Sequence, residues 1–153
     1  MIEPLRIAFD VGCPPEQTFE LWTARTSVWW PTTHTVSAQP GVEVIIEPGV
    51  GGRIYERTPQ GDEHDWGQVT TWEPPDRISY LWHLRQNRAD ATEVEITFAA
   101  TDGEGDGTTV SIVHHGWDQL GIRGQERRDS NQRGWAGLLP HFKAAATDES
   151  AAR

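Results

Sequence analysis

The sequence predicts an α+β domain in which a curved antiparallel sheet of six to seven strands wraps around a long C-terminal helix. Strand-like runs rich in aromatic residues alternate with Gly and Pro corners between Val42 and His115. Before them, one apolar run leads into two short helical segments, and from about Gln125 the apolar residues recur with the period of a helix. We expect a single domain over residues 1–146, because a chain of 153 residues leaves no room for a second core of ordinary size.

The N-terminal part of the chain predicts one strand followed by two short helices. Apolar residues occupy every second position from Leu5 to Val11, so this segment is expected to form a strand with one buried face. Pro14-Pro15 suits the first turn of a helix, where a proline loses no intrahelical hydrogen bond. Trp29-Trp30-Pro31 indicates a second short helical turn, and a loop rich in Thr and Pro follows it up to Gly41.

Six further strands are expected in the middle of the chain. Gly49-Val50-Gly51-Gly52 supplies the glycines that a tight hairpin needs, and Glu73-Pro74-Pro75-Asp76 marks a corner. A glycine-rich turn over residues 102–107 imitates the start of a calcium loop, but Val113 stands where that loop needs a carboxylate, so we interpret it as a solvated turn. The runs expected to form these strands are 42–46, 53–56, 64–72, 78–84, 92–100 and 108–115.

Alternation within the later strands predicts which side chains face the helix. His83 directly follows Trp82, so its side chain is expected on the opposite, outer face of the sheet. The residues expected to face inward are Ile78, Tyr80, Trp82, Leu84, Val94, Ile96, Phe98, Val110, Ile112 and His114.

The C-terminal helix is predicted from a stripe of apolar side chains at positions i, i+3, i+4 and i+7. Trp135, Leu138, Leu139 and Phe142 form this stripe, which must be buried against the sheet. The segment 147–153 carries small and polar residues with nothing evident to pack against, so a flexible tail is expected there.

Composition argues against several classes of partner. The 23 acidic and 13 basic residues give a formal net charge of −10, which repels nucleic-acid phosphates and anionic membrane surfaces. The single Cys13 permits no internal disulfide, and the N-terminus lacks the basic and hydrophobic regions of a signal peptide. We therefore expect a cytoplasmic protein without nucleic-acid or membrane partners, and the sequence is compatible with a homodimer.

Short motifs follow one another through nearly the whole chain. They are Pro14-Pro15-Glu16 with Phe19 and Trp22, Trp29-Trp30-Pro31, Glu47-Pro48 with Gly51-Gly52-Arg53, Trp66-Gly67-Gln68-Val69, Glu73-Pro74-Pro75 with Arg77 and Trp82, Ala91-Thr92-Glu93-Val94 with Phe98, Gly107-Thr108, His114 with Gly116-Trp117, and Gly134-Trp135 with Leu138-Leu139. In this order and spacing the chain resembles the START/SRPBCC helix-grip superfamily. Within it, the chain is similar to the AHSA-like family, related to the C-terminal domain of the heat-shock-chaperone ATPase activator. The resemblance implies a helix-grip fold, which in other proteins holds lipids, hormones or polyketides.

A sheet curled around one helix rarely fills its whole concavity, and the unfilled space is a pocket. The aromatic lining predicts a small apolar or aromatic ligand, of a size that fits a pocket of about 300–1,000 Å³. No cofactor and no metal are expected, because the adjacent His114 and His115 point to opposite faces of a strand and cannot chelate one ion. The residues expected to line the cavity are Trp30, Trp66, Tyr80, Trp82, Ile96, Phe98, Ile112, His114, Trp135, Leu138 and Leu139.

Two other functions stay open. The resemblance allows an aromatase/cyclase-like enzyme, which would need the inward His114 as a general base, although His114 is equally well explained as a core histidine satisfied by a neighbour. The resemblance also suggests a protein-interaction module that stimulates a chaperone ATPase, but the activator has an additional N-terminal domain that this sequence lacks. Arg53, Arg77 and the arginines of 123–128 are expected to form surface ion pairs; the alternative is that one orients a ligand carboxylate at the pocket mouth.

Overall fold

The computed structural model describes residues 1–101 and 106–152, so residues 102–105 of the expected glycine-rich turn lie outside the described part. Its helices are α1 (Pro15–Thr23), α2 (Thr26–Trp29) and α3 (Gly124–Ala152), with short 3-10 helices η1 (Thr32–His34), η2 (Arg88–Asp90) and η3 (Trp117–Arg123). Its strands are β1 (Leu5–Val11), β2 (Glu43–Ile46), β3 (Arg53–Arg57), β4 (Glu63–Glu73), β5 (Arg77–Trp82), β6 (Thr92–Ala100) and β7 (Thr108–His115).

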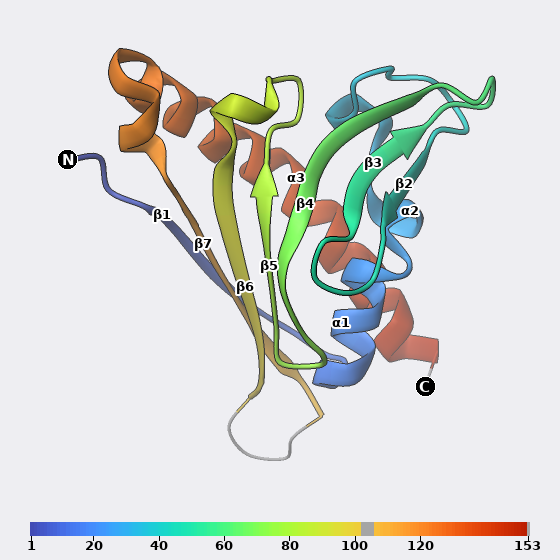
Figure 1. The fold of residues 1–153 in the computed structure, drawn as a ribbon. Coiled ribbons are helices and arrows are strands. Elements are labelled where there is room, and N and C mark those ends of the chain that lie inside the picture. The colour runs from blue at the N-terminus through green and yellow to red at the C-terminus, as the bar shows by residue number, and fades with distance from the viewer. Residues whose placement is uncertain (102–105, 153) are drawn as a thin grey trace.

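All seven strands form one antiparallel sheet in the order β1-β7-β6-β5-β4-β3-β2. The long helix α3 runs across one face of this curled sheet, and α1 and α2 lie on the same side (Figure 1). The predicted α+β helix-grip architecture, with a C-terminal helix held by a curved sheet, is therefore confirmed.

Two features of the strands explain the curvature of the sheet. The β3–β4 and β4–β5 registers shift between Ile54 and Tyr55 and between Val69 and Thr71, and such bulges bend and twist a strand. Between the shifts, β4 approaches β5 closely at Gly67, where an added Cβ would lie 2.0 Å from the carbonyl oxygen of Leu81. Only glycine fits at this position of β4.

The inward face follows the predicted alternation. Along β7, Val110, Ile112 and His114 are buried, whereas Ser111 and Val113 between them are only half-buried. The stripe on α3 packs against this face, as its period predicts. Trp135, Leu138, Leu139 and Phe142 are all buried there.

Aromatic rings fill the centre of the fold. The ring of Trp22 on α1 lies 4.8 Å from Trp29, 6.5 Å from Phe98, 6.3 Å from Trp135 and 4.9 Å from Phe142, measured between ring centroids. These residues belong to three helices and one strand, so a single side chain joins the sheet to all of the covering helices. The space between the sheet and α3 is closed at this level.

The end of the chain differs from the expected tail. Helix α3 continues to Ala152, and Glu149 forms an ion pair with Arg25 and accepts a hydrogen bond from Gln17. Ser150 donates a hydrogen bond to the carbonyl oxygen of Gly12. The sequence did not reveal these contacts because they are polar and join segments that are far apart along the chain. No helix in the described part of the chain is long and apolar enough to cross a membrane.

Candidate ligand-binding pocket

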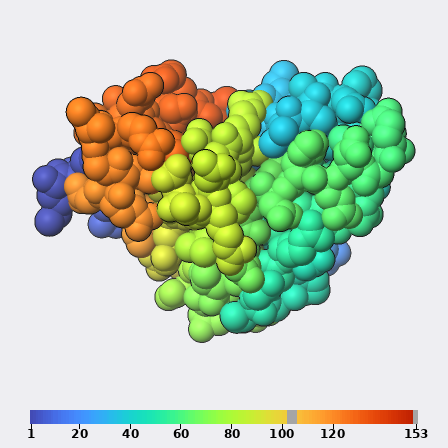
Figure 2. Space-filling model, turned by 45° about the horizontal axis from the view of Figure 1, so that its top comes forward, coloured from blue at the N-terminus to red at the C-terminus, as the bar shows by residue number. Residues whose placement is uncertain are grey.

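A groove lies where η1, the connection from β5 to β6 and the first half of α3 meet. In Figure 2 these segments, coloured light blue, yellow-green and orange, adjoin one another on the face turned toward the viewer. The groove consists of three adjoining hollows of about 200, 150 and 60 Å³. The outer and middle hollows share Gln86, Arg127 and Ser130, and the middle and inner hollows share His34, Trp82, Leu84, Asn131 and Gly134.

The inner hollow is apolar. Trp30, Trp82, Leu84, Trp135 and Leu138 form most of its wall. The rings of Trp30 and Trp82 lie 5.9 Å apart, and the indole N–H of Trp30 donates a hydrogen bond of 2.9 Å to the carbonyl oxygen of His34. This bond fixes one wall of the hollow against η1, so the aromatic surface is present before any ligand arrives.

The structure divides the residues expected to line the cavity into two groups. Trp30, Trp82, Trp135 and Leu138 line the inner hollow. The others lie in the packed core: Trp66, Tyr80, Ile96, Phe98, Ile112, His114 and Leu139. Each hollow of the groove is smaller than the expected pocket, because the aromatic rings around Trp22 occupy the space between the sheet and α3.

His114 is fully buried, and neighbouring side chains bond both of its ring nitrogens. The indole N–H of Trp135 donates to Nδ1 at 3.1 Å, so the proton lies on Nε2, which donates to the hydroxyl of Thr92 at 2.7 Å. Burial lowers the pKa of His114 to about 3, so the ring stays neutral. The sequence left open whether His114 acts as a general base or is a core histidine bonded by its neighbours. The geometry favours the core histidine, which joins α3 to β6 and β7.

The sequence predicted His83 on the outer face of the sheet, but the structure buries it beside the groove. Strand β5 ends at Trp82, so the alternation of faces does not extend to the next residue. His83 is only 7% exposed and contributes to the wall of the middle hollow. Its Nδ1 is buried and has no hydrogen-bond partner among the described residues.

Arg85 ties two walls of the groove together. Its guanidinium donates hydrogen bonds to the carbonyl oxygens of Thr33 (3.1 Å) and Thr35 (2.7 Å). The backbone of Arg85 has a φ of 64°, in the left-handed region that side chains other than glycine rarely adopt. Such strain persists where the surrounding structure enforces it, and here the contacts with the η1 segment do so.

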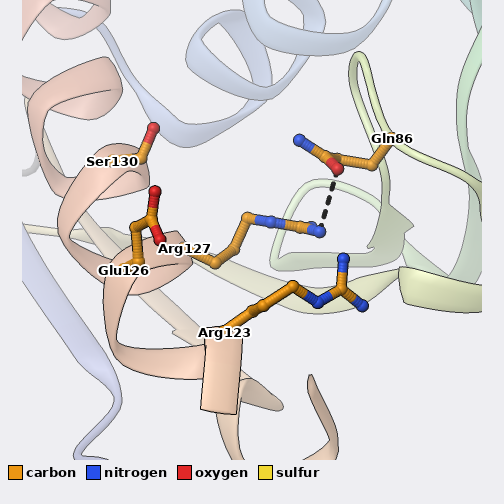
Figure 3. A pocket seen from close by; sticks show the side chains of 5 residues that line it. All are labelled: Gln86, Arg123, Glu126, Arg127 and Ser130. Carbon is orange, nitrogen blue, oxygen red and sulfur yellow. Dashed lines mark hydrogen bonds between the residues drawn. The ribbon is translucent and has the colours of Figure 1, made fainter. Parts of the chain in front are cut away.

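Arg127 occupies the boundary between the outer and middle hollows. Figure 3 shows Arg123 and Arg127 extending toward Gln86, with Arg127 donating a hydrogen bond of 3.0 Å to the amide oxygen of Gln86. Arg127 also donates to the carbonyl oxygen of Asp90, whose carboxylate forms an ion pair with Arg123. Burial, together with the charge of Arg123, lowers the pKa of Arg127, although Asp90 opposes this shift.

The sequence matches a known protein family over most of its length. Residues 12–147 match the family described as Activator of Hsp90 ATPase homolog 1-like protein. The chain belongs to this family. The predicted AHSA-like resemblance is therefore confirmed.

Two solved structures are similar to this family member. The anthrahydroquino-gamma-pyrone synthase Txn09, solved in complex with SUM, is 32% identical over 74% of this chain and 76% of its own, with a TM-score of 0.54. The self-sacrificing resistance protein CalC from Micromonospora echinospora is 25% identical over 99% of this chain and 98% of its own, with a TM-score of 0.72. A search of the curated proteins found no match.

Several pocket residues of this family member have no signal in the sequence. His34, Gln86 and Asn131 are isolated polar residues in a loop, a connection and a helix, and only the folded chain brings them together. The sequence indicated the arginines of 123–128 as a cationic group. Their position relative to the pocket depends on where α3 begins. Arg53 and Arg77 form the expected surface ion pairs, with Glu63, Asp65 and Glu95.

One group of side chains on the outer face has the composition of a metal site. Ligand atoms of Glu93, Glu95 and His115 all lie within 4.8 Å of one another, and the His115 Nε2 is 2.9 Å from the nearer Glu95 oxygen. The adjacency of His114 and His115 along the chain gave no indication of this set. It arises because the β6–β7 register brings Glu93 and Glu95 beside His115. All three side chains are half-exposed, and Glu95 also faces Arg77 at 3.6 Å. Within the described part of the chain, these residues are the ones that could hold a metal ion.

Proposed function

We propose that this protein binds a small apolar or aromatic molecule in the groove between η1, the β5–β6 connection and α3. The observation that carries the proposal is the inner hollow, where Trp30 after α2, Trp82 on β5 and Trp135 on α3 present indole surfaces. A concave apolar wall with a few polar groups at its entrance is the usual form of a small-molecule site.

The size of the groove favours a ligand of one or two rings. Its inner and middle hollows measure about 60 and 150 Å³ and are continuous through their shared lining. The inner hollow alone is smaller than the cavity of about 150 Å³ that holds one benzene ring, so an aromatic ring would lie across the inner and middle hollows against Trp82, with its substituents extending past Asn131 toward Gln86.

The similar proteins support an aromatic ligand. The synthase Txn09 is named for an anthrahydroquino-gamma-pyrone, which is an aromatic compound, and the identity of 32% extends over 74% of this chain. The alternative of an enzyme that uses His114 has no support from its geometry. Both ring nitrogens of His114 are bonded within the core, and none of the three hollows includes it.

The binding proposal is tested with naphthamide, an uncharged two-ring probe, followed by tryptophan fluorescence and thermal unfolding. We expect saturable quenching and a rise in the melting temperature, because the probe contacts indole rings and binds only the folded state. Trp82→Ala should weaken binding by about tenfold or more, since it removes an aromatic wall of the groove.

Trp72→Ala serves as the matched control. Trp72 packs on Phe19 and lines a separate apolar hollow with Pro74 and Pro75, so this variant loses the same side chain from another hollow without changing the groove. Its affinity for naphthamide should equal that of the unmodified protein. The proposal fails if one- and two-ring aromatic probes produce neither quenching nor a thermal shift, or if Trp82→Ala alters stability alone.

A further inference from the structure

The mouth of the groove carries an inference about the charge of the ligand, and this inference rests on the proposed function. We propose that the ligand is an amphipathic organic anion, whose aromatic body contacts Trp82 and Trp135 and whose carboxylate or comparable anionic group pairs with Arg127 beside His83.

Arg127 is placed to reach a ligand. It lines both the outer and the middle hollow, so its guanidinium borders the space into which the polar substituent of a ring held against Trp82 would extend. A guanidinium offers five N–H donors, and within the described residues Arg127 uses its donors on Gln86 and on the carbonyl oxygen of Asp90. The remaining donors are free for the paired hydrogen bonds that a planar guanidinium makes with a carboxylate.

The charge around the groove contrasts with that of the whole protein. The chain has a formal net charge of −10, yet the charged residues lining the outer and middle hollows are Arg85, Arg123, Arg127 and Glu126, of which Arg123 is paired with Asp90. A local excess of positive charge in a concave site attracts anions and repels cations.

His83 lies in the wall of the hollow that Arg127 also lines. It is only 7% exposed, and its Nδ1 is buried within the wall. The imidazole therefore closes the hollow beside the guanidinium, and Arg127 is the side chain that reaches an anionic group of the ligand.

The apolar inner hollow argues against a small inorganic anion as the ligand. Phosphate or acetate would reach Arg127 but would leave the indole surfaces of Trp30, Trp82 and Trp135 uncovered. The groove is therefore complementary to a molecule that has both parts, an aromatic body and an anionic group.

The test compares naphthoic acid with naphthamide, two probes of nearly the same shape that differ in charge at neutral pH. Dissociation constants are measured by fluorescence and calorimetry for the unmodified protein, Arg127→Gln and Arg133→Gln. Arg133 is the matched control, because it is an exposed arginine on the same helix that lines none of the three hollows. Acetate is added as a competitor that has the charge without the ring.

We expect the unmodified protein to bind naphthoic acid about tenfold more tightly than naphthamide, as a charge-assisted pair predicts. Arg127→Gln should abolish this preference, because the acid loses much more affinity than the amide, whereas Arg133→Gln should retain it. Added salt should weaken the binding of naphthoic acid and leave the binding of naphthamide unchanged. Acetate should compete only weakly, because it lacks the apolar contact.

The possible failures are distinguishable. Equal affinity for acid and amide in the unmodified protein would overturn the inference about charge and leave the proposed binding function standing. An equal loss of acid binding in Arg127→Gln and Arg133→Gln would also overturn it, since the preference would then come from the overall field. If neither naphthalene probe binds, both proposals are wrong.

Discussion

At the scale of single residues, Glu56 shows how this fold accommodates a buried charge. The side chain is fully buried, and its carboxylate accepts hydrogen bonds from the backbone N–H groups of Val36 (2.6 Å) and Ser37 (2.9 Å) and from the indole of Trp66 (2.8 Å). Burial acts to raise the pKa of Glu56, but these hydrogen bonds outweigh it and hold the pKa below its usual range. The carboxylate thereby anchors the loop after η1 to the sheet.

Replacing this carboxylate by an amide should destabilise the fold. In Glu56→Gln, an amide group faces N–H donors and satisfies fewer of them, so we expect the free energy of unfolding to fall by about 2 kcal/mol at pH 7. Urea denaturation measures this loss. Glu43→Gln is the matched control on an exposed site and should stay within about 0.5 kcal/mol of the unmodified protein. Equal stability of the two variants would mean that the hydrogen bonds of Glu56 contribute little.

Residue-level prediction from the sequence succeeded where a strand continued and failed where it ended. Alternation placed His114 on the inner face, which is correct, because β7 extends through that position. Whether His114 lined a cavity or a packed core depended on the indole of Trp135, more than twenty residues away in the sequence. His83 was misplaced because the chain leaves the strand after Trp82.

At the scale of elements, the contact between α3 and the sheet centres on Trp135. Its ring stacks near Trp22, and its N–H reaches His114. Trp135→Ala should therefore lower the free energy of unfolding by about 3–5 kcal/mol, since it leaves a large cavity in the core. Trp135→Phe should cost less, because a ring remains and only the hydrogen bond to His114 is lost. Near-native stability of Trp135→Ala in urea would contradict the role assigned to this stripe.

The elements themselves were predictable because each has a local cause. Apolar alternation, Pro14-Pro15 and the stripe on α3 fixed the type and order of the helices and strands, with boundaries that differ by a few residues from those observed. The walls of the groove were less accessible to sequence reasoning. They depend on contacts such as those of Arg85 with Thr33 and Thr35, which join segments with no common pattern.

At the scale of the whole molecule, the buried titratable groups make stability depend on pH. His114 has its pKa lowered from 6.5 to about 3 in the folded state, so below pH 6.5 the unfolded chain binds a proton that the folded chain does not. Acidification therefore favours the unfolded state. The depressed pKa of Glu56 acts in the same direction at lower pH, because its carboxylate must be ionised to keep its hydrogen bonds.

The contribution of His114 is measured between pH 6.5 and pH 5.5, above the ordinary titration range of Asp and Glu; the pKa of His34, which partial burial lowers, adds a change in the same direction. In this window the unmodified protein should lose up to about 1.4 kcal/mol of unfolding free energy per pH unit through His114. His114→Gln should be less stable at pH 7, because Trp135 and Thr92 lose well-placed partners, but its stability should change much less over the same interval. Parallel slopes for His114→Gln and the unmodified protein, measured by urea denaturation at each pH, would show that His114 gains a proton as readily in the folded chain as in the unfolded one.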